Sequence, residues 1–445
     1  MSTTVARNGT AAAASVSRDA VDPELLDGLV SILELVRSGA ASTRPELSQR
    51  SGLGRSVITQ RLSYLLASGL LVESGLGAST GGRAPRKLSL NGEAGVVLVA
   101  PVGSSHLTVG VTDLAGRLLE YHREAADVAA GPEPILSRVS ELFGQMLASP
   151  NMPAGAPLFG IGLGLPSAVE FAAGTAVSPP AMPGWDSYDV RGLFTGRYDV
   201  PVWVDNDVNL MALGELRAGA ARAEKDVIFV KVGTGIGAAL ISGGALHRGA
   251  QGSAGEIGHR KADEDNGVIC RCGQVGCLSA LAGGNAVTSA ALAAARAGRS
   301  TVLSQILDSR QAEGTELSFS DVLSAAERGD TVAVNLIAGS GRLVGEALAT
   351  LVSFFNPSLV LVGGKVADAG DLLLAAVREG IYRRSLPLAT RNLKITLSAL
   401  RPDPGLYGAA FMVLDELFSR QNLGRWLHHG TPAGHTDITP TTHVA

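Results

Sequence analysis

The segment GSAGEIGHRKADEDNGVICRCGQVGCLS, residues 252–279, contains every cysteine of the 445-residue chain. Cys270, Cys272 and Cys277 follow shortly after His259. Three thiolates and one imidazole satisfy a tetrahedral Zn²⁺ ion, and the intervening glycines let a short loop close around it. Because four protein ligands leave no open position for a substrate, the spacing predicts a structural zinc site. The alternative is three independent buried thiols in a reducing compartment.

The motifs E-I-G-H at residues 256–259 and C-x-C-G-x-x-G-C at residues 270–277 resemble the signature of the ROK family (repressors, open reading frames and sugar kinases). The similarity extends over roughly residues 23–418. It implies that His259 both binds zinc and helps to shape a sugar pocket. It also implies a winged helix-turn-helix followed by a two-lobe, actin-like α/β domain of the ribonuclease-H-like type.

Length and composition limit the protein class. A chain of 445 residues with 46% hydrophobic and 18% charged residues has enough apolar material for two or three domains. The net charge of −4 excludes a protein that is basic overall, so any contact with nucleic acid is confined to one local surface. We find no export signal and no segment long enough to span a bilayer, and therefore expect a cytoplasmic protein with no membrane partner.

Four segments follow from the composition. Residues 1–20 are small and polar and are expected to form a disordered tail. Residues 21–90 are expected to form a winged helix-turn-helix DNA-binding domain, and residues 91–418 the two-lobe effector-binding domain with the zinc site. Residues 419–445 turn polar, with irregularly spaced histidines, and are expected to form a second disordered tail.

The DNA-binding prediction rests on three short helices expected within residues 23–69. A tight, glycine-containing turn near Gly52 joins the second helix to the third, as in helix-turn-helix units. The third helix has one apolar face, and the side chains expected to contact DNA are Arg55, Ser56, Thr59, Gln60, Arg61 and Tyr64. A three-helix unit that binds protein, or is purely structural, is the alternative.

A wing is expected after the third helix. Residues 71–73 and 87–90 can pair as strands around a glycine-rich tip. The region is locally basic, as expected of a surface that contacts phosphates. Arg83 and Arg86, in Gly-Arg-Ala-Pro-Arg, resemble arginine hooks that enter narrow minor grooves. An ordinary solvated linker is the alternative for this hook.

The two-lobe prediction begins at Gly95. Three apolar runs at residues 96–100, 107–112 and 118–121 are typical of an antiparallel meander, and a helix and a further strand follow them. This succession resembles the first of two ribonuclease-H-like lobes that face each other across a hinge.

The sugar-binding residues follow from the resemblance. The strand at residues 200–204 leads into Asp205-Asn206-Asp207 at the start of a helix. In ROK sugar kinases an Asn-Asp pair at this place binds sugar hydroxyls, and its aspartate is the catalytic base. The resemblance therefore implies a sugar site formed by Asn206, Asp207, Glu256 and His259. A carboxylate that only caps the start of the helix is the alternative.

Three positions depart from the kinase pattern. Pro101 occupies the place of the first aspartate in Asp-x-Gly-Gly-Thr, and it can neither bind a cation nor donate a backbone hydrogen bond. Ala239 replaces a glycine, and Ser279 replaces the glutamate that accepts hydrogen bonds from the sugar. We therefore expect no kinase activity, with Asp207 as a vestigial base.

These expectations combine into a sugar-responsive transcriptional regulator, expected to act as a repressor, that controls carbohydrate metabolism. Its expected partners are double-stranded operator DNA, a sugar or sugar-phosphate effector, and further copies of itself in a homodimer or homotetramer. The alternatives are an ATP-dependent sugar kinase, of the glucokinase or amino-sugar type, with an added DNA-binding arm, and a dimerisation scaffold without a ligand.

Overall fold

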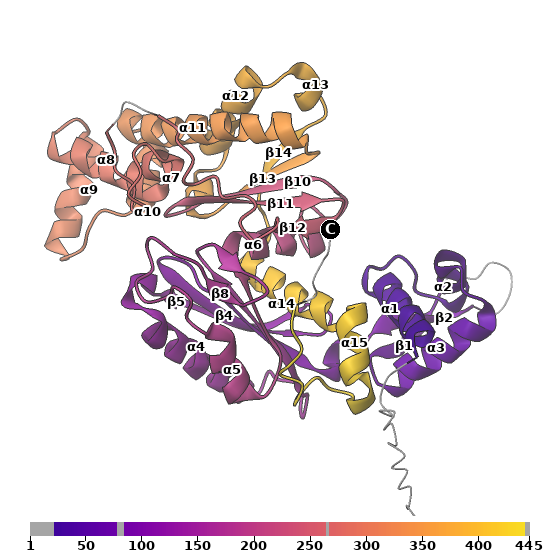
Figure 1. The fold of residues 1–445 in the computed structure, drawn as a ribbon. Coiled ribbons are helices and arrows are strands. Elements are labelled where there is room, and N and C mark those ends of the chain that lie inside the picture. Colours follow the sequence, from indigo (N-terminus) through magenta and orange to yellow (C-terminus); the bar gives the residue numbers. More distant parts are fainter. Residues whose placement is uncertain (1–21, 78–83, 264–266, 441–445) are drawn as a thin grey trace, which may run out of the picture. The chain divides into compact units, whose positions relative to one another are not determined.

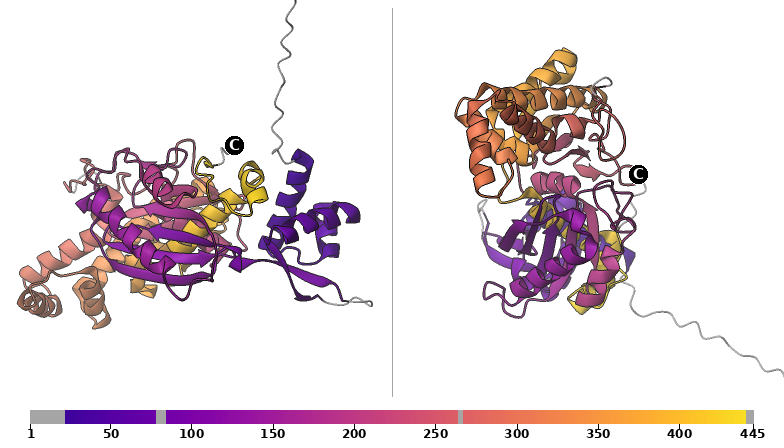
Figure 2. Two further views of the ribbon diagram at one scale, coloured as in Figure 1. Left: turned by 90° about the horizontal axis from the view of Figure 1, so that it is seen from below. Right: turned by 90° about the vertical axis from the view of Figure 1, so that its left-hand side faces the viewer.

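A computed structural model describes residues 22–77, 84–263 and 267–440. The chain divides into two compact units, and the larger is built from two lobes (Figures 1 and 2). Unit 1 comprises residues 1–89 and 418–430, and unit 2 comprises residues 90–417 and 431–445. The expected N-terminal tail at residues 1–20 lies outside the described residues.

Unit 1 begins with three helices, α1 (Pro23–Arg37), α2 (Arg44–Ser51) and α3 (Arg55–Ala67). Thr43 and Glu46 form a capping box that fixes the start of α2. Gly52, at φ +71°, ends the helix in the left-handed conformation that glycine adopts without strain. The apolar faces meet in a small core that includes Leu29, Leu33, Leu47, Ile58, Leu62 and Leu65.

A two-stranded sheet of β1 (Leu71–Leu76) and β2 (Arg86–Leu90) follows these helices. An antiparallel bridge between Thr43 and Lys87 joins β2 to the residue that precedes α2. The backbone N–H of Leu88 also donates to the carbonyl of Ser42 (2.7 Å). The sheet is thereby attached to the helices of its own unit.

The expected disordered tail at residues 419–445 is wrong over most of its length. Residues 420–429 form α15 (Arg420–Trp426) and the short 3₁₀ helix η4 (Leu427–His429) within unit 1. Arg420 forms an ion pair with Asp27 of α1, and Trp426 is completely buried. Residues 431–440 belong to unit 2, where Ile438 is also buried, and residues 441–445 lie outside the described residues. The polar composition of this segment did not predict its structure, because the burial of a few large apolar residues suffices to dock a short helix.

The first lobe of unit 2 contains a five-stranded sheet in the order β5-β4-β3-β6-β9. Strands β3, β4 and β5 form the expected antiparallel meander, and β6 and β9 continue the sheet in parallel. Its elements are η1 (Gly92–Ala94), β3 (Val96–Pro101), β4 (His106–Asp113), β5 (Leu118–Ala125), η2 (Val128–Ala130), α4 (Pro132–Leu147), β6 (Leu158–Leu165), the short β7 (Val169–Glu170) and β8 (Thr175–Ala176), α5 (Val190–Tyr198) and β9 (Val202–Asn206).

The second lobe repeats this plan with the strand order β12-β11-β10-β13-β14. It again has an antiparallel meander followed by two parallel strands. Its elements are β10 (Val227–Val232), β11 (Ile236–Ser242), β12 (Ala245–His247), α7 (Leu278–Ala282), α8 (Gly284–Arg296), α9 (Thr301–Ala312), α10 (Phe319–Glu327), α11 (Thr331–Phe355), β13 (Leu359–Gly363), η3 (Lys365–Ala369), α12 (Asp371–Arg384), α13 (Pro387–Thr390) and β14 (Lys394–Leu397).

Two helices, α6 (Asp207–Arg217) and α14 (Pro404–Leu417), lie between the two sheets of unit 2 (Figure 1). Their backbones approach so closely that side chains are excluded at the contact. A Cβ atom on Gly408 would lie 1.7 Å from the carbonyl oxygen of Leu210, and one on Gly214 would lie 2.1 Å from that of Pro404. The close contact fixes the first turns of both helices beside the cleft described below.

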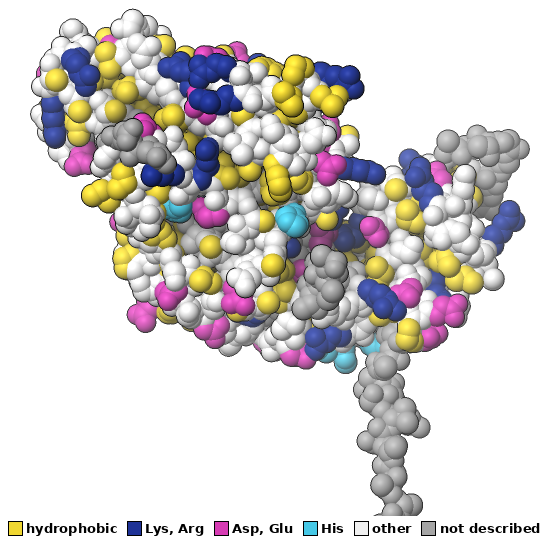
Figure 3. Space-filling model, turned by 45° about the horizontal axis from the view of Figure 1, so that its top comes forward, with side chains coloured by type: hydrophobic (Ala, Val, Ile, Leu, Met, Phe, Trp, Pro, Cys, Tyr) yellow, Lys and Arg dark blue, Asp and Glu magenta, His cyan; other side chains and the backbone are white. Residues whose placement is uncertain are grey.

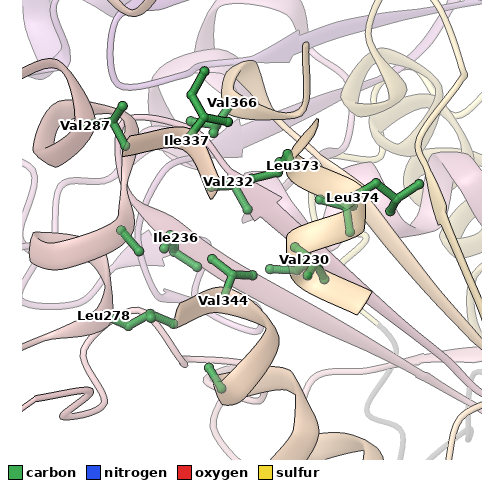
Figure 4. Close-up of a cluster of buried hydrophobic side chains, with 14 of the residues drawn as sticks. Val230, Val232, Ile236, Leu278, Val287, Ile337, Val344, Val366, Leu373 and Leu374 are labelled. Atoms are coloured by element: carbon green, nitrogen blue, oxygen red, sulfur yellow. The ribbon is translucent and has the colours of Figure 1, made fainter. Parts of the chain in front are cut away.

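The core of the second lobe consists of aliphatic side chains from its sheet and its helices (Figure 4). Val230 and Val232 from β10 meet Ile337 and Val344 from α11 and Leu373 from α12. The sequence analysis found no segment long enough to span a bilayer, but α11 is long and apolar enough to do so by length and composition. Half of its most apolar stretch is buried within the fold. That burial is typical of a core helix in a globular domain.

The docking of α15 gives a stability prediction. Trp426 stacks at a tilt against Phe418, with ring centroids 5.9 Å apart, and is fully buried. Replacing it by alanine should lower the free energy of unfolding of unit 1 by about 3–5 kcal/mol, through lost apolar burial and the cavity left behind. Urea unfolding of the full chain measures this change.

The matched control is His428→Ala, an exposed change in the following turn. It should alter the unfolding free energy by less than about 0.5 kcal/mol. Equal stabilities of the two variants would contradict the burial of α15.

Candidate functional site

A cleft of about 1830 Å³ opens between the two lobes of unit 2. Residues from both sheets line it, including the turn after β3, the start of α6, the glycine turn after β10 and the start of α14. On the face in Figure 3, histidine and acidic side chains lie along the boundary between the lobes. The predicted sugar-binding residues Asn206, Asp207, Glu256 and His259 all line this cleft.

Asn206 is the N-cap of α6. Its Oδ1 accepts the backbone N–H groups of Val208 (2.8 Å) and Asn209 (3.2 Å), and its Nδ2 donates to the carbonyl of Ser167 (2.7 Å). Both lone pairs of Oδ1 are therefore used, and one N–H of Nδ2 remains for a ligand. The cap of α6 is thus the amide of Asn206 rather than the carboxylate that the sequence left open, and this role limits Asn206 to donating to a ligand.

Asp207 begins α6 and carries a carboxylate that is 7% exposed. Its Oδ2 accepts a short hydrogen bond from Nζ of Lys231, a side chain that is 18% exposed on β10. The first lobe therefore supplies the carboxylate, through the segment that follows β9, and the second lobe supplies the cation. The pair engages this carboxylate with a partner other than substrate.

A second ion pair of the same kind flanks Asn206 on its other side. Asp205 is 1% exposed, and its Oδ2 accepts a hydrogen bond from Nε of Arg248 (2.8 Å), which follows β12 of the second lobe. The guanidinium also lies over the ring of Phe171, 3.7 Å from its centroid. Because Oδ1 of Asp205 accepts from Nδ2 of Asn209 (2.8 Å), this carboxylate also helps to shape the start of α6.

In the turn at residues 101–105, the first three positions offer no free backbone donor for a phosphate. Pro101 has no N–H, and the next two N–H groups are already used within the fold. That of Val102 donates to Gly164 (2.9 Å), and that of Gly103 donates to the carbonyl of His106 (2.8 Å). The substitution noted in the sequence is therefore accompanied by a backbone that turns its donors to the protein.

Two further carboxyl groups line the cleft. Desolvation by the cleft walls raises the pKa of Glu256, an effect that the nearby His259 opposes. Burial also raises the pKa of Asp403, whose Oδ1 accepts the N–H of Gly405 (2.8 Å) at the start of α14. For both carboxyl groups, burial raises the pKa by more than the nearby positive charges lower it.

Ser279, the position where the kinases place a glutamate, is bound to the protein backbone. Its hydroxyl accepts the N–H of Ile236 (2.9 Å) and can donate to the carbonyl of the same residue (3.2 Å). The residue thereby ties the start of α7 to the glycine turn before β11. The sequence indicated only a shorter, neutral group at this position, and the structure shows where its hydrogen bonds go.

The predicted metal ligands His259, Cys270, Cys272 and Cys277 form one cluster. Their ligand atoms all lie within 4.8 Å of one another. Sγ of Cys270 lies 3.6 Å from Nδ1 of His259, and the Sγ atoms of Cys272 and Cys277 are also 3.6 Å apart. Tetrahedral bonds to Zn²⁺ separate neighbouring ligand atoms by about 3.5–3.8 Å, so this donor set fits the ion.

The backbone around the cluster explains how four ligands converge. Antiparallel bridges join Ile269 to Val275 and Lys261 to Cys277, and Gly273 makes the turn at φ +85°. Burial raises the pKa of the Cys277 thiol to about 12, so a thiolate at this position requires a cation beside it. A metal ion bound to the four ligands supplies that cation.

The predicted DNA contacts divide into two groups. Arg55, Ser56, Thr59, Gln60 and Tyr64 are exposed along α3. Arg61 is not, since it is 7% exposed and its guanidinium packs against Gly28 of α1 and donates to the carbonyl of Glu24 (3.5 Å).

The prediction that Arg61 contacts DNA is wrong. Helical spacing puts this residue at the edge of the polar face, and there the small Gly28 leaves room for its long side chain to pack inward. Arg86 is 64% exposed and pairs with Glu73 (2.8 Å). Arg83 lies outside the described residues.

Sequence reasoning missed Lys231 and Arg248, the cations that pair with Asp207 and Asp205. One signal was available for Lys231, because it interrupts the otherwise apolar strand Val227–Val232, and a lysine in such a strand is rarely buried without a partner. Nothing in the sequence pairs Arg248 with Asp205, which lies more than forty residues earlier.

The cleft gives a pH prediction through His106 at the start of β4. Burial, and then the positive charges of Arg123 and Lys231, lower its pKa from 6.5 to about 4. Between these values the unfolded chain binds more protons than the folded one, so the free energy of unfolding should fall as the pH decreases from about 6.5 to about 4.

Urea unfolding at several pH values checks this dependence, and His106→Gln should make it shallower. The control His247→Gln changes an exposed histidine and should leave the slope as it is. An imidazole of His106 that titrates near 6.5 in the folded protein by NMR would contradict the prediction.

Comparison with known proteins agrees with this architecture. A profile of the ROK family matches residues 99–416. The xylose repressor of Caldicellulosiruptor bescii is 29% identical over 389 residues, which cover 87% of this chain and 95% of that protein. The glucokinase of Streptomyces coelicolor is 31% identical over 321 residues, which cover 71% of this chain and 96% of the enzyme.

The likeness to solved structures includes unit 1. The crystal structure of a ROK family transcriptional regulator, described as a homolog of the E. coli MLC protein, matches with a TM-score of 0.76 at 25% identity. That match covers 92% of this chain and all of the other. With a family match across well over half of its length, and with both lobes and the cleft in place, this chain belongs to the ROK family.

Proposed function

We propose that this protein is a cytoplasmic, sugar-responsive transcription factor that represses genes of carbohydrate metabolism. The observation that carries the proposal is the combination of a kinase-like cleft, which has Pro101 in place of the kinase aspartate, with a separate unit that exposes the polar face of helix α3. Similarity to a xylose repressor over 87% of this chain supports the same conclusion.

Unit 1 is proposed to bind operator DNA as a winged helix-turn-helix. Helix α3 would enter the major groove and present Arg55, Ser56, Thr59, Gln60 and Tyr64 to the bases and phosphates. The wing would place Arg86 at the minor groove, and the same role is proposed for Arg83, which lies outside the described residues. Arg61 is better explained as a structural residue that joins α3 to α1.

The effector is proposed to bind in the cleft through Asp207, Glu256, His259 and the remaining N–H of Asn206. A ligand that contacts both lobes favours the closed arrangement over the open one, and it changes DNA affinity only through that difference. The oligomer is proposed to be a homodimer or homotetramer, because a palindromic operator needs two recognition helices. Exposed apolar side chains near the ends of α11 and α12 support a subunit contact, and they include Phe354, Leu386 and Leu388.

A sugar kinase is the second candidate, favoured by the 31% identity to a glucokinase and by the presence of Asp207, Glu256 and His259. Two features oppose it. Pro101 removes the carboxylate that would help to hold Mg²⁺, and Lys231 occupies the carboxylate that would act as the base. We therefore propose that catalytic activity has been lost.

The metal cluster is proposed to hold a structural Zn²⁺ ion. When bound, the ion supplies the positive charge that keeps three thiolates together and fixes the loop that carries His259 to the cleft.

Removing the metal should destabilise unit 2. At a free zinc concentration of 1,000 times Kd, bound metal stabilises a fold by about 4 kcal/mol, and this contribution is lost on chelation. Elemental analysis should find one zinc per chain in the wild type and less in Cys272→Ser, whose melting temperature should also fall. The control Gln274→Ala changes an exposed side chain of the same loop and should keep the metal. A metal-free wild type with an unchanged melting temperature would contradict the zinc site.

DNA binding is tested by selecting duplexes from a random library with the full chain. Affinity for the selected duplex is then measured by fluorescence anisotropy, with and without a panel of sugars. Gln60→Ala should weaken binding by about tenfold through loss of a base contact. The control Glu34→Ala, an exposed change on α1, should not weaken it. Failure to enrich any duplex would refute DNA binding, and an enriched duplex whose affinity no sugar alters would refute the sugar response.

A further inference from the structure

Lys231 is the one charged residue of β10, and it reaches across the cleft to Asp207. Its neighbours along the strand, Val230 and Val232, are fully buried in the core of the second lobe. A lysine in such a strand loses hydration, and that loss is offset only by a close partner. The ion pair with Asp207 is therefore a built feature of the cleft rather than a chance surface contact.

The pair presents both kinds of hydrogen-bonding atom to the cleft. An ammonium group has three N–H donors. Among the described residues, the hydrogen bond made by Nζ of Lys231 is the one to Asp207, which uses one of these donors. Oδ1 of Asp207 has no partner of this kind among the described side chains, so it remains as an acceptor. A sugar hydroxyl both donates and accepts, and it can thus bind to the two residues without separating them.

A phosphoryl group does not fit the same arrangement. The net charge of the pair is zero, and the cleft also contains the carboxyl groups of Glu256 and Asp403. A phosphate that bound Nζ in place of Asp207 would leave that carboxylate buried without its cation, which is strongly unfavourable. The first two backbone donors after Pro101, those of Val102 and Gly103, offer no compensation, since they bond to carbonyl groups of the protein.

The remaining cations of the cleft lie farther out or are already paired. Lys365 binds Asp368 (2.8 Å), and both side chains are exposed. Arg123, Arg271 and Arg401 are exposed to solvent at the cleft. Solvent screens charges at such positions, so they offset the inner carboxyl groups only weakly.

We propose that Lys231 is a specificity-determining residue of the effector site, which with Asp207 selects the hydroxyl groups of a neutral sugar and rejects its phosphorylated form. This inference rests on the proposed function, because it assumes that the cleft binds a sugar.

The test uses the zinc-loaded full chain and isothermal titration calorimetry. The probes are D-xylose, D-glucose with glucose 6-phosphate, and N-acetyl-D-glucosamine with its 6-phosphate. At least one neutral sugar should bind, and it should bind roughly tenfold or more tightly than its phosphate. Tighter binding of a phosphate would overturn the inference and leave the proposed sugar response intact. Absence of binding by every probe would overturn the sugar response itself.

Variants assign the selectivity to Lys231. Lys231→Met should raise Kd for the neutral sugar by roughly tenfold, because a hydrogen bond to a charged group is lost. Lys231→Arg keeps the charge and should recover part of the affinity. The control Lys394→Met breaks a lysine–carboxylate pair with Glu224 elsewhere on the same lobe and should bind as the wild type does.

A purely structural role would weaken all ligands equally, so the ratio of the two Kd values is the decisive measurement. In Lys231→Met the preference for the neutral sugar over its phosphate should change, and an unchanged preference would overturn the inference. If this variant does not fold, the double variant Asp207→Asn with Lys231→Met removes both charges and permits the same comparison. Wild-type affinity and preference in the double variant would equally overturn it.

Discussion

The architecture of unit 2 depends on the burial of two carboxylates, Asp205 and Asp207, within one short segment. Each is almost inaccessible to water, and a buried carboxylate without a partner costs several kcal/mol. Their partners, Arg248 and Lys231, come from the second lobe. The charges of one lobe are therefore satisfied only when the other is in place, which links the start of α6 and its capping residue to the relative position of the two sheets.

The same constraint explains how a kinase-like cleft serves a binding protein. In an enzyme the base carboxylate must be free to accept a proton from the attacking hydroxyl. Here a lysine pairs with it, and the N–H groups of Val102 and Gly103 bond to protein carbonyls. Under the proposed function, the proline at position 101 and the engagement of Asp207 both act against catalysis. Both leave the sugar-contacting wall of the cleft in place.

The cluster of His259 and the three cysteines positions a different part of the cleft wall. Its four ligands fix the loop between His259 and Cys277, and Ser279, directly beyond, bonds to the backbone of Ile236 at the glycine turn. His259 belongs to both features, because its Nδ1 lies in the cluster and the residue also lines the cleft. Thus the segment that identifies the family in the sequence also connects the candidate metal cluster to the cleft.

The sequence by itself determined the elements whose signals are local. These are the four-ligand cluster within residues 259–277, the antiparallel meander of the first lobe, and the proline at position 101. Only the tertiary structure decided which distant charges meet. It paired Lys231 with Asp207 and Arg248 with Asp205, turned Arg61 inward against Gly28, and docked α15 where polar composition indicated a tail. Such contacts join residues far apart in the chain, and their energy depends on the burial that the packed fold creates, which no local pattern records.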